Sequence, residues 1–322
     1  MIGRARLMIA ALSLALASTA AGAQGFPTKP VRMLVPNAAG GAVDVLARTL
    51  GQALAKTWGQ QLVVDNRPGA GGIIASQALI QSPPDGYTLI LVAAGHPLNQ
   101  FFYPKLPYDT FKDFTAITEV SDMPLTINVA KASPVKDLKE LLAQAKAKPG
   151  SLSYGMSGYG TSAHLAGELL NHMAGVKIVS IPYKGGAPAL TAVIAGEIPM
   201  SVNPMSEVIG QLEGGTVRAL AVTTAARSPV LPNVPTVAEQ GVTGYATGNW
   251  FGLLGPKGMD AALVAKIQAD VATALKDPTV VDYLKKVGSI PVGSTPQAFE
   301  AFMRAEADKW GPVIKAANIK VE

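Results

Sequence analysis

Short apolar runs alternate along the chain with longer stretches in which apolar residues recur every three or four positions. The short runs predict buried strands and the longer stretches predict helices. The predicted strands are residues 31–36, 61–64, 87–93, 125–129, 152–154, 178–182, 198–203, 217–223 and 250–254. The predicted helices are residues 43–58, 72–81, 135–148, 162–174, 188–195, 261–275, 279–287 and 296–317. Strands that alternate with helices in this way indicate an α/β fold rich in parallel sheet.

The predicted elements fall into two series, which indicates two α/β lobes. We expect one domain from residues 24–122 together with 229–322, and a second domain from residues 123–228. The helices that end the chain should pack back on the first lobe. One local plan occurs once in each series, because residues 31–48 and residues 152–170 both read strand, glycine-rich turn and helix.

The one sustained apolar run lies at the N-terminus and has the composition of an export signal. Two arginines precede the apolar residues 7–17, and the small residues 21–23 offer a cleavage site. Residues 1–23 are therefore predicted to be a signal peptide that directs the mature protein to the periplasm. No stretch reaches the roughly 20 apolar residues of a membrane-spanning helix, so we expect no stable membrane insertion. The chain has no cysteine, which excludes disulfides and cysteine-linked lipids.

Composition and charge narrow the class of partner. Of the 322 residues, 48% are hydrophobic and 15% are charged, which excludes a disordered chain. The formal net charge is +5, and two of those charges belong to the arginines of the predicted signal peptide. Lysine and arginine are scattered rather than clustered, which argues against a nucleic-acid partner. A mildly positive balance suits small acidic ligands.

The glycine-rich turn at residues 155–163 has the length of a catalytic or cofactor-binding turn. A nucleophile elbow needs G-x-S-x-G, but here a glycine follows Ser157 directly and breaks the motif. A dinucleotide-binding turn needs an acidic residue at the end of the next strand, which here ends at Pro182 without one. His164 and His172 lie eight residues apart on a predicted helix, about 12 Å, too far to bind one metal ion. We therefore expect no catalytic residue, cofactor or metal.

The remaining interpretation of this turn is an anion site at the start of a helix. The first backbone N–H groups of a helix have no partner inside it, and the helix dipole attracts negative charge. Thr161 and Ser162 add hydroxyl groups there, or one of them only caps the helix. In the first lobe, Gly40 and Gly41 are expected to offer free N–H groups to a second carboxylate. Asp44 either stabilises that helix start or accepts a hydrogen bond from a ligand hydroxyl, ammonium or water.

A third turn from strand to helix lies at residues 181–190, IPYKGGAPAL. Here Lys184 could add positive charge to the site, and Tyr183 could supply an apolar wall with a hydroxyl. The structural alternative is a solvated lysine beside a packed tyrosine, which is the usual state of lysine.

Eight segments extend these local patterns over nearly all of the predicted mature chain. In order they are FPTKPVRMLVPNAAGGAVDVLARTL, VVDNRPGAGGIIA, PDGYTLIL, YDTFKDF, YGMSGYGTSAHLAGELL, IPYKGGAPALTAVIAGEI, VRALAVTTAARSPVLPNVPTVAEQG and WFGLLGPKG. Together they resemble the Bug-type solute receptors of tripartite tricarboxylate transporters. The resemblance implies a two-domain periplasmic binding protein (flytrap) fold, with a cleft between the domains that closes on a small carboxylate without cofactor or chemistry.

Carried over by position, the resemblance also implies which residues bind the ligand. The predicted ligand-binding residues are Asn37, Ala39, Gly40, Gly41, Asp44, Gly95, His96, Gly158, Tyr159, Gly160, Thr161, Ser162, His164, Tyr183, Lys184, Gly185 and Asn203. The family commonly has an aromatic residue and a proline at the positions of Asn37 and Ala39, and an aspartate at that of Asn203. The segment AAGHPLNQ, which contains Gly95 and His96, replaces a run of small polar residues. These departures concern the choice of ligand more than the fold.

The sequence thus predicts a periplasmic solute-binding protein that captures a small organic anion. We expect it to act as a monomer and to deliver its ligand to separately encoded membrane components of a tripartite tricarboxylate transporter. One alternative is a receptor that presents its closed form to a signalling partner. A secreted hydrolase that uses Ser162 and His164 is less favoured, because the nucleophile motif is broken.

Overall fold

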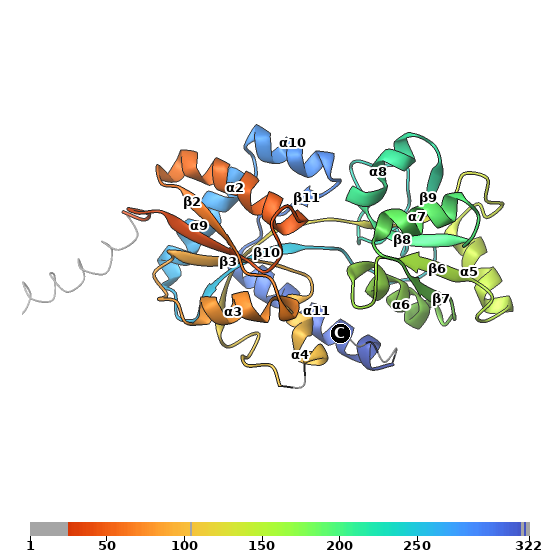
Figure 1. The fold of residues 1–322 in the computed structure, drawn as a ribbon, viewed down its shortest axis with the longest axis horizontal. Helices are drawn as coiled ribbons and strands as arrows, with labels where there is room; N and C mark the ends of the chain where they lie inside the picture. Colours follow the sequence, from red (N-terminus) through yellow and green to blue (C-terminus); the bar gives the residue numbers. More distant parts are fainter. Residues whose placement is uncertain (1–24, 104, 317–318, 320–322) are drawn as a thin grey trace, which may run out of the picture.

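The computed structural model describes residues 25–103, 105–316 and 319, and these form two α/β lobes that lie side by side (Figure 1). The first lobe is built on a six-stranded sheet and the second on a five-stranded sheet. This arrangement confirms the predicted two-domain α/β fold. The predicted signal peptide, residues 1–23, lies outside the described residues.

The sheet of the first lobe has the strand order β11–β4–β10–β3–β1–β2. Its strands are β1 (Val31–Val35), β2 (Leu62–Asn66), β3 (Thr88–Ala93), β4 (Phe114–Asp122), β10 (Phe251–Pro256) and β11 (Ile290–Pro291). β1 pairs in parallel with β2 and β3, whereas β10 is antiparallel to β3 and β4. The helices of this part of the chain are η1 (Ala70–Gly72), η2 (His96–Leu98), α2 (Ala42–Trp58), α3 (Ile73–Ile80), α4 (Asn99–Phe102), α9 (Ala261–Ala274), α10 (Pro278–Lys286) and α11 (Pro296–Ala316).

The sheet of the second lobe has the order β7–β6–β8–β5–β9. Its strands are β5 (Leu125–Ala130), β6 (Ser153–Met156), β7 (Val179–Pro182), β8 (Met200–Pro204) and β9 (Val217–Val222). β6 is parallel to β7 and β8, whereas β5 is antiparallel to β8 and β9. Its helices are α5 (Leu138–Ala147), α6 (Ser162–Ala174), α7 (Gly186–Ile194) and α8 (Met205–Glu213).

Two connections join the lobes. The chain passes from the first sheet to the second between Asp122 and Leu125, and returns between Val222 and Phe251. We keep the division at 122/123 and 228/229 as a proposal, because both positions fall in these connections. Among the described residues, none of the helices combines the length and apolarity required to cross a bilayer.

The first sheet is buried on both faces, which explains the consecutive apolar residues 33–35 of β1. Met33 and Val35 pack in the same cluster as residues of α2 and α9, and Leu34 packs in a cluster with residues of α3 and α11. All three side chains are fully buried. A strand covered on both faces has no polar alternation, as the sequence indicated.

The last helix departs from the expected packing of the tail. Near its start, Phe299 and Met303 belong to a core cluster of the first lobe. Trp310, Val313 and Ile314, two to four turns further on, belong to the core of the second lobe. The expectation that the tail packs on the first lobe therefore holds for the start of α11 but not for its end.

Candidate ligand site

With one exception, the predicted ligand-binding residues lie on loops that follow parallel strands or in the first turn of the next helix. In the first lobe these loops follow β1 and β3, and in the second lobe they follow β6 and β7, whereas Asn203 lies within β8. Because the carboxyl ends of parallel strands meet at the same edge of a sheet, the loops gather at one edge of each lobe.

A pocket of about 400 Å³ lies at this edge of the first lobe. It is lined by Pro36, Asn37, Ala38, Pro68, Gly69, Gly71, Gly72, Ser76, Val92, Ala93, Gly95 and His96. Burial lowers the pKa of His96 to about 4, so its ring is neutral at pH 7 and the pocket lining carries no charge. Of these lining residues, Asn37, Gly95 and His96 were predicted to bind the ligand. The glycine-rich turn after β2 was not predicted to bind it, although this turn also lies between a strand and a helix.

Asp44 organises the turn between β1 and α2. Its carboxylate is 2% exposed and accepts hydrogen bonds from the Gly40 N–H (2.8 Å), from Nδ2 of Asn66 (3.0 Å) and from Nε of Arg48 (3.0 Å). Arg48 chiefly, helped by Gly40 and Asn66, lowers the pKa of Asp44 to about 2 despite its burial. Its oxygens are therefore occupied within the turn, which favours the structural role.

The expectation of free N–H groups at Gly40 and Gly41 is wrong. The Gly40 N–H donates to Asp44, and the Gly41 N–H donates to the carbonyl oxygen of Ala38 at 3.3 Å. A tight turn satisfies its own donors, which the sequence does not show. The next three amides, of Ala42, Val43 and Asp44, have no carbonyl one turn earlier in the helix.

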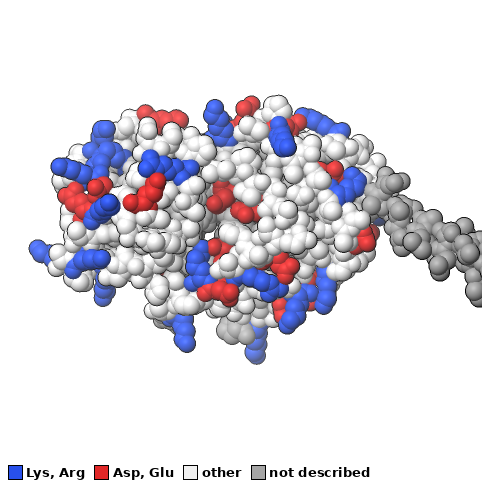
Figure 2. Space-filling view, turned by 180° about the vertical axis from the view of Figure 1, so that it is seen from behind, with Lys and Arg blue, Asp and Glu red and all other residues white. Residues whose placement is uncertain are grey.

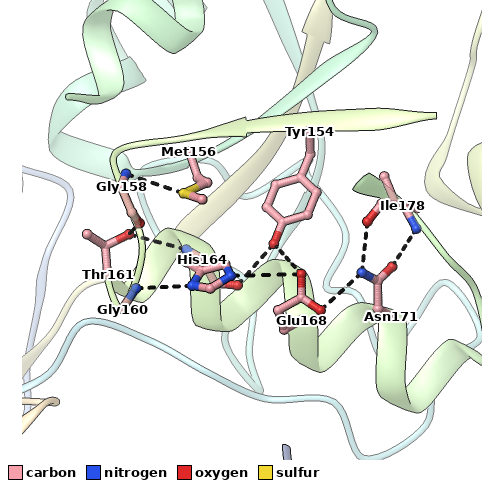
Figure 3. A network of polar contacts seen from close by, with 9 residues as sticks. All are labelled: Tyr154, Met156, Gly158, Gly160, Thr161, His164, Glu168, Asn171 and Ile178. Atoms are coloured by element: carbon pink, nitrogen blue, oxygen red, sulfur yellow. Dashed lines mark hydrogen bonds and ion pairs between the residues drawn. The ribbon is translucent and has the colours of Figure 1, made fainter. Parts of the chain in front are cut away.

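The turn between β6 and α6 repeats this arrangement in the second lobe, as Figure 3 shows. The Gly160 N–H donates to Nδ1 of His164 at 3.0 Å. Thr161 caps α6, because its Oγ1 donates to the Gly158 carbonyl (2.8 Å) and accepts from the His164 N–H (3.3 Å). In both lobes, the third residue of the helix accepts a hydrogen bond from the glycine N–H four residues earlier.

A partly buried polar network extends from the second turn along α6 (Figure 3). The Tyr154 hydroxyl contacts Oε1 of Glu168 at 2.9 Å and the His164 carbonyl at 3.2 Å. Oε1 of Glu168 also lies 4.0 Å from Nε2 of His164. Asn171 continues the network, with one bond to Glu168 and two to the backbone of Ile178. The network thus connects the turn to β6 and to the segment before β7.

A cavity of about 60 Å³ lies between the lobes. It is lined by Ala94, Gly95, Leu98, Gly160, Ser162, Leu165, Thr247, Gly248, Asn249, Glu306 and Trp310. Gly95 lines both this cavity and the larger pocket of the first lobe. The structure therefore brings Gly160 and Ser162, at the start of α6, against the loop after β3 rather than against Gly40.

The contribution of α11 to the lining of this cavity was not predicted. Glu306 is 5% exposed, its carboxylate pairs with Nζ of Lys309, and Nε1 of Trp310 donates to it at 3.0 Å. Lys309 also donates to the Ala246 carbonyl at 2.8 Å. This ion pair neutralises the carboxylate nearest the cavity. The only sequence signal was a glutamate on the apolar face of an amphipathic helix.

Several predicted residues line neither the pocket nor the cavity. Tyr159 is 58% exposed, and its ring lies edge-on to that of His164. Lys184 is exposed and Tyr183 is half-buried. Asn203 is fully buried, where its Nδ2 donates to the Gly186 carbonyl at 3.2 Å.

The other predicted residues shape the turns. Ala39 is exposed in the turn after β1. Gly158 and Gly185 have φ angles of 128° and 114°, a backbone conformation that favours glycine. Gly185 also stands at the N-cap of α7.

Charge on the surface follows the scattered pattern of the sequence. On the face in Figure 2, Lys and Arg side chains are spread over both lobes among acidic ones. Among the described residues, no group of three or more His, Asp or Glu side chains is arranged to bind a metal ion.

Two lobes, each with glycine turns at the carboxyl ends of its parallel strands, and a cavity between them define a solute-binding protein of the two-domain class. The particular family follows from the sequence. Residues 46–319 match the model of the tripartite tricarboxylate transporter family receptor, and the chain belongs to this family.

Known proteins agree with this assignment. Protein BugT of Bordetella pertussis is 34% identical over 302 residues, which are 93% of each chain. An R. palustris protein whose structure was solved with adipate is 36% identical, with a TM-score of 0.74 over 92% of this chain and 99% of that one. MatC from Rhodopseudomonas palustris, with bound malate, is 32% identical, with a TM-score of 0.70 over 90% of this chain and 100% of that one. The resemblance to Bug-type receptors is confirmed.

Proposed function

We propose that this protein is a periplasmic receptor that binds a small organic carboxylate between its lobes, as a monomer, and delivers it to the membrane components of a tripartite tricarboxylate transporter. Family membership supports the transport role. The adipate and malate of the two similar structures support the ligand class. The observation that carries the proposal is the cavity, where the start of α6 meets the loop after β3.

The start of α6 supplies the donors for one carboxylate group. The amides of Ser162 and Ala163 have no carbonyl one turn earlier in the helix, and Ser162, which also carries a hydroxyl, lines the same cavity. Each hydrogen bond to a charged group contributes about 1.5–3 kcal/mol. Three such bonds, aided by the helix dipole, bind a carboxylate without a cationic side chain.

The rest of the ligand extends into the first-lobe pocket. A cavity of about 60 Å³ takes little more than one carboxylate group, whereas the adjoining pocket measures about 400 Å³. Gly95 lines both of them, and an added Cβ at this residue would meet no atom within 4 Å. The ligand then contacts both lobes at once, and this favours the closed form over the open one.

The test compares the exported protein, residues 24–322, with its Ser162→Ala variant. Thermal shift against adipate, malate, glutamate and benzoate identifies a ligand, and calorimetry then measures its affinity. Losing one charge-assisted hydrogen bond weakens binding by about 10- to 150-fold. The matched control is Ser206→Ala, an exposed serine in the first turn of α8, which leaves the affinity unchanged.

Two outcomes contradict the proposal. One is a folded protein whose melting temperature no carboxylate raises. The other is a carboxylate whose affinity is equal in the Ser162→Ala and Ser206→Ala proteins, because the start of α6 would then take no part in binding.

A further inference from the structure

The two ligand-site turns use the same hydrogen bond but different acceptors. In the first lobe the acceptor is Asp44, whose pKa of about 2 keeps it ionised at any pH above 4. In the second lobe the acceptor is His164, a side chain whose unperturbed pKa lies near neutrality. Only the second turn therefore depends on a histidine.

Protonation of His164 is incompatible with the observed geometry. Nδ1 accepts the Gly160 N–H at 3.0 Å, so this nitrogen carries no proton, and the neutral ring holds its proton on Nε2. The imidazolium form has a proton on both nitrogens. Its Nδ1–H would then point at the Gly160 N–H, and two donors cannot form a hydrogen bond.

Gly160, whose N–H would lose its acceptor, is part of the cavity lining. Gly160 and Ser162 both line it, and Thr161 between them caps α6 by accepting the His164 N–H. A turn that loses the bond to Nδ1 therefore changes the position of the carboxylate donors. We propose that His164 is a positioning residue, which holds the carboxylate-binding turn in place only while its ring is neutral, so that protonation of this side chain weakens ligand binding. This inference rests on the proposed function of the turn.

The groups that face His164 set the pH range. Burial lowers the pKa of His164 below its usual 6.5, and Glu168, with Oε1 4.0 Å from Nε2, opposes that shift in part. From β6, the hydroxyl of Tyr154 holds the same carboxylate oxygen, and the Tyr159 ring centre lies 5.2 Å from that of His164. Burial raises the pKa of Tyr154, so its hydroxyl keeps its proton. Because the bound state needs the neutral ring, affinity is full above the pKa of His164 and falls as the pH drops through it.

The first experiment needs no ligand. Nuclear magnetic resonance follows the Gly160 amide and the His164 ring nitrogens of the exported protein from pH 8 to pH 4.5. We expect the Gly160 signal to shift together with His164 in the unmodified protein and to stay constant in His164→Asn, whose amide oxygen can take the place of Nδ1. The control His172→Asn removes an exposed histidine of the same helix and behaves like the unmodified protein. A Gly160 signal that still titrates in His164→Asn overturns the proposal.

The second experiment measures adipate binding by calorimetry at pH 7.5 and pH 5.0. We expect the affinity of the unmodified protein to fall more than that of His164→Asn, a comparison that cancels the ionisation of adipate itself. His164→Ala, which has no acceptor, binds weakly at both pH values. Equal pH dependence in the unmodified and His164→Asn proteins, or tighter binding in acid by the unmodified protein alone, overturns the proposal. If adipate binds no variant, that result counts against the proposed function, and the resonance experiment still decides the role of His164.

Discussion

Replacing Gly167 with alanine tests how closely the second turn depends on the packing beneath it. Gly167 lies in α6 against the ring of Tyr154. An added Cβ would lie 2.2 Å from Cζ and 2.5 Å from the hydroxyl oxygen of Tyr154, far inside van der Waals contact. The tyrosine is 1% exposed, so it has no free space into which to move.

The expected cost follows from three contributions. Overpacking a filled core costs about 1–3 kcal/mol. Moving the Tyr154 hydroxyl away from Glu168 removes a hydrogen bond to a charged group, about 1.5–3 kcal/mol. The better helix propensity of alanine returns about 1 kcal/mol. Gly167→Ala should therefore lower the free energy of unfolding of the second lobe by about 1.5–5 kcal/mol.

Gly210→Ala is the matched control, because Gly210 also lies inside a helix of the second lobe. There an added Cβ meets no atom within 4 Å, so the change should stabilise by about 0.5–1 kcal/mol. Urea denaturation at pH 7.5 measures both variants against the unmodified protein. Equal stability of the two alanine variants would refute the packing argument, since they differ only in what the new methyl group meets.

Two further predictions concern buried carboxyl groups. Asp44→Ala leaves the Gly40 N–H and the Asn66 amide without their acceptor and should lower the free energy of unfolding by about 1–3 kcal/mol. Asp44→Asn keeps an acceptor oxygen and should cost less. Urea denaturation at pH 7 ranks the two variants, and the reverse order contradicts the structural role of Asp44. Glu119 has a pKa raised to about 7, chiefly by burial and then by two neighbouring carboxylates. The folded protein keeps this proton while the unfolded chain loses it near pH 4.5, so stability declines as the pH rises from 4.5 to 7. Glu119→Gln should therefore be more stable than the unmodified protein by about 1–3 kcal/mol at pH 8 and equal to it at pH 4. Thermal denaturation measures this difference. A variant that is less stable at pH 8 would argue against a buried, destabilising charge.

The elements that follow a local pattern could be predicted from the sequence. β1 is an apolar run and α2 an amphipathic stretch, and both were found. β4 was missed because its inward side chains include Thr118 and Ser121, which are fully buried yet polar. Thr118 is accommodated there because its hydroxyl donates to the carbonyl of Ser294 at 2.8 Å, a partner 176 residues away. No window of local sequence contains that partner.

The candidate site also has parts that could be predicted from the sequence and parts that could not. The glycine turns at Gly40 and Gly160 were visible as local motifs. Their internal hydrogen bonds were not, because Asp44 is fixed partly by Asn66, 22 residues further on and on the neighbouring strand. The contribution of Glu306 was also hidden, since it depends on where the last helix crosses between the lobes.

That crossing helix also constrains the order in which the protein assembles. Every strand of the second lobe is encoded between residues 125 and 222, yet Trp310 and Val313 complete its core and are 2% exposed there. A ribosome makes the chain from its N-terminus, so the apolar surface that these side chains cover stays open until nearly the whole protein has been synthesised. The lobe in the middle of the sequence therefore finishes folding no earlier than the lobe whose two segments enclose it.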